Sequence, residues 1–216
     1  GEKLLLEAVE SGLEIVDVFV EEGYAVSRPY DACVHVVSRS VLESLSEVST
    51  PQGVVATVAT PKTEPPASYP EGFIVALDRL QDPGNVGTII RTADAMGAAG
   101  VLLSTDTADP FSGKAMRAAA GSTYHLPVWV AALEPELGRL IAQGALCLAG
   151  DLSGSETLPE IGRRCVLVIG NEGSGVSKAV AARCVRYRLP MKGKAESLNA
   201  SVAAGILMYV LSKQVP

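Results

Sequence analysis

Apolar runs alternate with amphipathic stretches along most of the chain. After residue 72, runs that are apolar almost throughout predict strands at residues 73–78, 99–104, 126–130, 145–150, 165–170 and 185–191. Helical periodicity between them predicts helices at residues 86–97, 112–121, 134–143 and 177–183, and an apolar helix that begins near Leu198. Continuous apolar strands joined by crossover helices are typical of an α/β fold with a mostly parallel sheet covered on both faces.

The residues before 60 show a shorter pattern. They predict a helix, two short strands, a second helix and a third strand, at residues 3–12, 17–22, 33–38, 38–48 and 53–60. Residues 60–72 are rich in Pro and lack periodicity, so they predict a linker. We therefore expect a small α/β domain at residues 1–67 and a larger domain at residues 68–216.

The loop after the first strand of the larger domain reads LDRLQDPGNVGTIIRTADAMG. Asp82, Pro83 and Gly84 predict a type II turn, after which Asn85 would cap the next helix. Arg91 lies off the apolar stripe of that helix. It either points toward the strand ends or forms a surface ion pair with Asp94.

Two later loops are also unusually polar. IGNEGSGVS contains glycines that let the backbone approach a ligand closely, yet it is neither a P-loop nor a Rossmann fingerprint. Alone it is typical of an ordinary turn with a solvated Glu172. In KGKAESLN, Ser197 or Asn199 can cap the last helix, but one cap does not explain both residues. Lys192 and Lys194 suit contact with a phosphate backbone, or are solvated loop charges.

Taken together and in this order, the loops resemble the three motifs of the SpoU/TrmH branch of the SPOUT RNA 2′-O-ribose methyltransferases. The motifs match as LDRLQDPGNVGTIIRTADAMGAAGVLL, VLVIGNEGSGVS and LPMKGKAESLNASVAAGIL, and the resemblance spans residues 73–211. Residues 1–67 resemble the small L30e-like substrate-binding domain of that family. The resemblance implies a C-terminal trefoil knot in the larger domain, an exception among folds.

The resemblance also implies a reaction, namely methyl transfer from S-adenosylmethionine to a ribose 2′-hydroxyl of RNA. The expected substrate is 23S ribosomal RNA, although tRNA methyltransferases and antibiotic-resistance rRNA methyltransferases share these motifs. The in-line displacement requires a held donor, an aligned hydroxyl and a proton acceptor, and it needs no metal. Arg91 would be either the general base or a phosphate anchor, since a guanidinium rarely gives up its proton.

By motif position, the resemblance assigns three groups of site residues. The implied catalytic residues are Asn85, Arg91, Glu172, Ser197 and Asn199. The implied donor-binding residues are Ile169, Gly170, Asn171, Gly173, Leu189, Met191 and Leu198. Lys192 and Lys194 would bind RNA. The family forms homodimers through the knotted domain, and a last helix that is apolar around most of its circumference fits that assembly.

Composition bears on the expected location of the protein and on whether it binds a metal. No apolar run reaches the roughly 18 residues of a membrane span. Four cysteines without a C-x-x-C pair favour buried thiols in a reducing cytoplasm, and two histidines show no zinc set. We therefore expect a cytoplasmic protein that has neither a metal nor a membrane partner.

Charge is distributed unevenly. Residues 1–67 carry 11 acidic and 4 basic side chains, whereas residues 68–216 carry 13 and 14. Because RNA affinity depends on Lys and Arg, and because the chain does not begin with Met, we expect a basic N-terminal segment before residue 1. Two alternatives stay open. One is a Rossmann-like nucleotide-dependent oxidoreductase, and the other is a catalytically inactive RNA-binding module.

Overall fold

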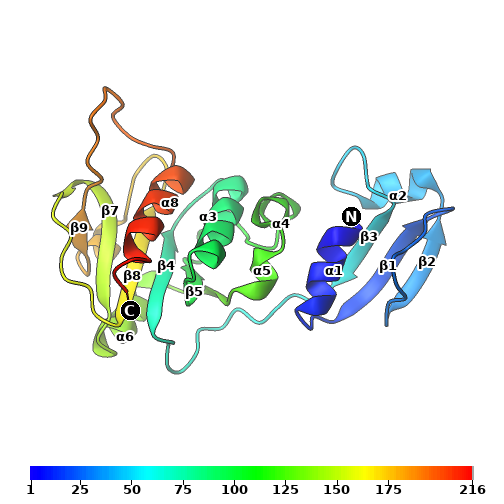
Figure 1. Cartoon of the computed structure of the whole chain (residues 1–216), viewed down its shortest axis with the longest axis horizontal. Coiled ribbons are helices and arrows are strands. Elements are labelled where there is room, and N and C mark those ends of the chain that lie inside the picture. Colours follow the sequence, from blue (N-terminus) through cyan, green and yellow to red (C-terminus); the bar gives the residue numbers. More distant parts are fainter. Residues whose placement is uncertain (216) are drawn as a thin grey trace. The chain divides into compact units, whose positions relative to one another are not determined.

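The computed structural model describes residues 1–215, and these residues form two compact units that divide between Pro61 and Lys62 (Figure 1). Within residues 1–215, no helix is long and apolar enough to cross a membrane. Each unit has its own sheet and its own buried apolar core.

The first unit is a three-stranded sheet with two helices. Its elements are α1 (Glu2–Glu10), β1 (Ile15–Glu21), β2 (Cys33–Val37), α2 (Arg39–Leu45) and β3 (Val54–Val58). The strand order is β2-β1-β3, with β1 parallel to β2 and antiparallel to β3. The core is thin: its buried apolar cluster consists of Leu5, Val18, Val20 and Val54, and Ala8 and Leu42 are also buried in the unit.

The second unit is built on a six-stranded sheet in which every pairing is parallel. Its strands are β4 (Gly72–Asp78), β5 (Gly100–Leu103), β6 (Val128–Val130), β7 (Leu146–Ser155), β8 (Arg164–Gly170) and β9 (Val185–Tyr187). They lie in the order β6-β5-β4-β8-β7-β9. This arrangement confirms the predicted α/β class.

Helices cover both faces of this sheet. They are α3 (Pro83–Ala95), α4 (Gly113–Ala119), α5 (Ser122–His125), α6 (Leu133–Ala142), α7 (Lys178–Ala181) and α8 (Ala200–Leu211). Alternate residues of β4 point to opposite faces of the sheet, so they contribute to two separate cores. Phe73, Val75 and Leu77 belong to the core that contains α3 and α8, whereas Ile74 and Ala76 belong to the core that contains α6.

One predicted strand is too long, and one short helix is not predicted. The strand predicted at 185–191 ends at Tyr187, because Pro190 cannot donate a ladder hydrogen bond and Leu189 and Met191 line a cavity instead. The short helix α5 was not predicted from the sequence.

The stretch predicted to be a linker also packs more tightly than expected. Tyr69 is 1% exposed, its hydroxyl donates to Glu136 Oε2 at 2.7 Å, and its backbone N–H donates to Gln143 Oε1 at 3.0 Å. Arg139 of α6 donates to the carbonyls of Pro66 and Ala67. The sequence from Lys62 onward therefore belongs to the second unit.

Candidate functional site

The site begins where β4 and β8 end together. Asp78, the last residue of β4, is paired with Gly170, the last residue of β8, so the loops that follow the two strands start side by side. Asp78 is buried, and its carboxylate accepts a hydrogen bond from Ser177 N at 2.6 Å and pairs with Arg79. These contacts fix the far end of the glycine loop to the end of β4.

The loop after β4 differs from its prediction. Asp82 caps α3 by accepting from Gly84 N at 2.9 Å, and Pro83 is the first helical residue, a position that proline favours. Asn85 is therefore not the cap. It lies in the first turn of α3 and is 9% exposed, so its amide is available for contacts with other loops.

The glycine loop after β8 is shaped by Asn171. Its backbone exchanges two hydrogen bonds with Gly175, at 3.1 and 2.9 Å. Its side-chain Oδ1 accepts from the N–H groups of Gly173 and Ser174, and its Nδ2 donates to the carbonyl of Arg79 at 2.8 Å. Asn171 thus holds the loop in shape and ties it to the end of β4.

Glu172 connects the glycine loop to the loop after β4. Its Oε1 accepts from Asn85 Nδ2 at 3.0 Å, and its carboxylate also accepts from the backbone N–H groups of Gln81 and Asp82. Burial alone would raise the pKa of the Glu172 carboxyl, but these hydrogen bonds outweigh burial and hold the pKa below its ordinary value. The carboxylate is therefore ionised at neutral pH.

Asn199 connects the third loop to the other two. Its Oδ1 caps α8 by accepting from the N–H groups of Ser201 and Val202, and its Nδ2 donates to Asn85 Oδ1 at 3.2 Å. A continuous hydrogen-bond chain from Glu172 through Asn85 to Asn199 therefore connects all three loops. Ser197 is exposed and does not cap the helix.

A cavity of about 690 Å³ opens between the glycine loop and the third loop. Its lining includes every residue predicted to bind the donor, together with Glu172, Ser197 and Asn199. Gly150, Asp151 and Leu152 of β7 also line the cavity, although no sequence motif predicts them there. The feature of the sequence that could have indicated these three residues is their place directly after an apolar run, at the carboxyl edge of a parallel sheet.

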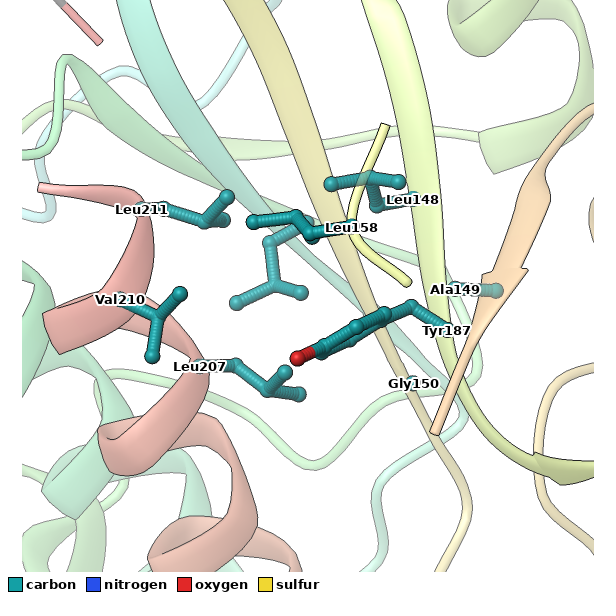
Figure 2. A pocket seen from close by; sticks show the side chains of 9 residues that line it. Leu148, Ala149, Gly150, Leu158, Tyr187, Leu207, Val210 and Leu211 are labelled. Carbon is teal, nitrogen blue, oxygen red and sulfur yellow. The ribbon is translucent and has the colours of Figure 1, made fainter. Parts of the chain in front are cut away.

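A second cavity, between β7 and α8, is much smaller (Figure 2). Its volume of about 10 Å³ is barely enough for one water molecule, and its lining is apolar apart from the Tyr187 hydroxyl, which points toward α8 in Figure 2. Gly150, Tyr187 and Leu207 line both cavities, so the smaller one is a packing gap behind the larger.

The structure does not bring Arg91 to this site within the chain. Arg91 is exposed on α3 and does not line the cavity. The alternative surface pair is also not formed, because Asp94 pairs with His125 Nδ1 at 3.4 Å. Among the described residues, the Arg91 side chain has neither an ion pair nor a hydrogen bond.

The basic residues near the third loop fall into two groups. Arg183, Arg186 and Arg188 each pair with an acidic side chain, namely Glu134, Asp151 and Glu156. Lys192 and Lys194 are exposed, and neither has an ion pair within residues 1–215. The two lysines are therefore better placed than the arginines to attract an anion.

The chain matches known proteins over nearly its whole length. Residues 72–209 match the SpoU rRNA methylase family, and residues 1–64 match the substrate-binding domain of RNA 2′-O ribose methyltransferases. The chain is 34% identical to 23S rRNA (guanosine(2553)-2′-O)-methyltransferase RlmP of Bacillus subtilis strain 168, over 98% of this chain and 86% of that protein.

Two solved structures that contain S-adenosylmethionine are also similar. The SpoU methyltransferase AviRb of Streptomyces viridochromogenes has a TM-score of 0.89 at 28% identity, covering 99% of this chain and 88% of that chain. An rRNA methyltransferase of Sinorhizobium meliloti has a TM-score of 0.86 at 33% identity, covering 100% and 86%. These similarities leave the alternative of a Rossmann-like oxidoreductase without support. The chain belongs to the SpoU rRNA methylase family.

Proposed function

We propose that this protein transfers a methyl group from S-adenosylmethionine to a ribose 2′-hydroxyl of RNA, and that its substrate is 23S ribosomal RNA. The hydrogen-bond chain from Glu172 through Asn85 to Asn199 carries the proposal, because it ties together the two loops that line the cavity by way of the helix that follows β4. The choice of 23S rRNA is supported by similarity to RlmP, whose name gives that substrate.

The cavity fits the methyl donor in size and chemistry. About 690 Å³ lies within the usual range of roughly 300–1,000 Å³ for small-molecule sites. Ile169, Leu189, Met191 and Leu198 give it apolar walls for an adenine ring. Glu172 and Asp151 place carboxylates at its lining, which favour a cationic sulfonium. The donor supplies an electrophilic methyl group, and the chain needs only to hold and align it.

The residues around the cavity then have distinct proposed roles. Glu172 fixes Asn85, and Asn85 in turn fixes Asn199, so the donor loops are organised before RNA arrives. Ser197, exposed at the cavity, is free to orient the ribose hydroxyl. Lys192 and Lys194 would bind backbone phosphates. Arg91 would anchor a phosphate that accepts the proton, since a guanidinium rarely gives up its own proton and is a poor base.

A homodimer would bring an Arg91 to the cavity. On α8, Val202, Ile206 and Tyr209 are exposed at positions that fall on one side of the helix, and α8 packs against α3, which carries Arg91. An exposed apolar stripe of this kind suits burial against a second copy. We therefore propose that α8 and α3 form the dimer interface and that the catalytic site lies beside it.

Ile206→Asp should convert the dimer to a folded monomer, because a charge at the centre of the stripe cannot be buried unpaired. Light scattering at micromolar concentration would measure this change. Val41→Asp in α2 is the matched control, since both side chains are 43% exposed on helices. A wild-type chain that is monomeric and fully active would contradict the proposed assembly.

The proposed activity has a direct test. We expect S-adenosylmethionine to bind in calorimetry with EDTA present, and labelled methyl to be incorporated into a 23S rRNA transcript at one ribose. Total tRNA serves as the competing substrate. Incorporation into tRNA alone would overturn the choice of RNA, whereas no donor binding at millimolar concentration would overturn the cavity assignment.

A further inference from the structure

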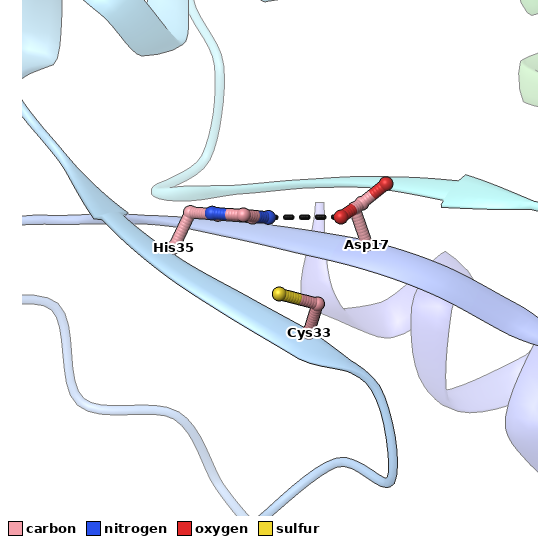
Figure 3. A group of neighbouring side chains, drawn as sticks. All are labelled: Asp17, Cys33 and His35. Atoms are coloured by element: carbon pink, nitrogen blue, oxygen red, sulfur yellow. Dashed lines mark hydrogen bonds and ion pairs between the residues drawn. The ribbon is translucent and has the colours of Figure 1, made fainter.

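Three potential metal ligands meet in the first unit, and none of them lines the donor cavity. Asp17 of β1 is paired in parallel register with Cys33 of β2, and His35 follows Cys33 by two residues. All three side chains therefore project from the same face of the sheet, as Figure 3 shows. One ligand atom from each residue lies within 4.8 Å of the other two.

We propose that Asp17, Cys33 and His35 bind a zinc ion that joins β1 to β2. The proposal is independent of methyl transfer, which needs no metal. The mixed ligand set indicates the ion, since a thiolate and an imidazole suit zinc, whereas magnesium and calcium prefer oxygen. The spacing of residues along the chain did not reveal this set, because the aspartate lies on a different strand.

The separations between the ligand atoms would have to change by no more than about 1.5 Å to reach those of a zinc site. Tetrahedral zinc, with bonds of about 2.0–2.3 Å, places its ligand atoms roughly 3.3–3.6 Å apart. His35 Nε2 now lies 2.8 Å from Asp17 Oδ1, so these two atoms would separate slightly as an ion entered between them. Three protein ligands leave a fourth position for water. Cys33 is exposed, and the other two side chains are partly so, which gives an ion access from solvent.

Neighbouring side chains already orient two of the ligands. Thr57 of β3 donates from Oγ1 to Asp17 Oδ2 at 3.3 Å, which leaves Oδ1 facing His35. Phe19 stacks on the His35 ring with centroids 4.9 Å apart and planes 16° apart, which restricts rotation of the imidazole. Support of this kind from outside the ligand set is typical of metal sites.

A bound ion would also stabilise the unit that contains it. Few apolar residues are buried there, and β2 is an edge strand paired with β1 alone. Because a metal that binds only the folded state adds its binding free energy to folding, zinc would compensate for this thin core.

The test uses the whole chain, stripped with a chelator and titrated with Co²⁺ alone. We expect one equivalent to give visible bands of tetrahedral cobalt and a near-ultraviolet thiolate-to-cobalt band, both lost when Zn²⁺ is added. Cys33→Ser should remove the thiolate band. Thr57→Val should weaken metal affinity by about tenfold, as expected for loss of an orienting contact.

Two control variants separate a site from incidental binding. His125→Asn breaks the other His–Asp pair, that with Asp94, and Cys184→Ser removes a thiol of the second unit. Both should leave the cobalt spectrum unchanged. Zn²⁺ should also protect Cys33 of the wild-type chain from alkylation, which mass spectrometry detects without any variant. Absence of the thiolate band in the wild-type chain, or its persistence in Cys33→Ser, would overturn the proposal.

Discussion

Replacing Gly170 with alanine should reduce affinity for S-adenosylmethionine at least a hundredfold. A Cβ at this position would lie 2.2 Å from Val176 N and 2.3 Å from Gly175 C, and both are backbone atoms. The glycine loop would have to move away from the end of β8, which would displace the wall of the cavity. We expect stability to fall by about 1–3 kcal/mol, the usual cost of overpacking. Calorimetry measures the affinity, and chemical denaturation measures the stability.

Gly173→Ala in the same loop is the matched control. A Cβ there would meet only Asn171 Oδ1 at 3.6 Å, an ordinary van der Waals contact. Donor affinity should therefore stay within a few-fold of the wild-type value. If both variants bind the donor normally, the cavity beside Gly170 is not the donor site. If both lose binding, the loop tolerates no side chain and the steric argument is wrong.

Much of the second unit could be predicted from the sequence because its strands are buried on both faces. Such strands are continuous apolar runs, and their parallel pairing follows from the helices between them. The polar loops then fall at the carboxyl edge of the sheet, where Glu172 and Asn85 do lie within hydrogen-bonding distance of each other.

The contacts within the site could not be predicted in the same way. Asp82 and Asn85 are equally good capping residues, and local sequence does not show which one caps the helix. Asp82 does so because Pro83 begins α3, and this leaves Asn85 to connect Glu172 with Asn199. Leu189 and Met191 were assigned to a strand because an apolar residue that faces a ligand cavity looks, in sequence, like one that faces a core.

Arg91→Ala should abolish methyl transfer while leaving donor binding and stability nearly unchanged. Arg91 is exposed, lacks an ion pair among the described residues, and does not line the cavity of its own chain. We expect turnover to fall at least a hundredfold, donor affinity to stay within about twofold, and stability to stay within about 0.5 kcal/mol. Arg91→Lys should also fail if the contact with RNA is planar and two-pronged. Single-turnover assays and calorimetry separate these effects.

Arg163→Ala is the control for loss of an exposed arginine, since Arg163 immediately precedes β8, at the end of the strand opposite Gly170. It should retain normal turnover. Near wild-type turnover in Arg91→Ala would show that Arg91 is only a solvated side chain.

Mixing two inactive variants should then reveal which subunit uses Arg91. Arg91→Ala keeps an intact donor cavity, whereas Gly170→Ala keeps Arg91 but loses the donor. If Arg91 of one subunit acts at the donor of the other, a mixed dimer contains one complete site, and activity should return when the two proteins are unfolded and refolded together. Refolding each variant alone is the control. If the mixed dimers form but stay inactive, Arg91 serves the donor of its own chain, and α3 would have to move toward the cavity when RNA binds.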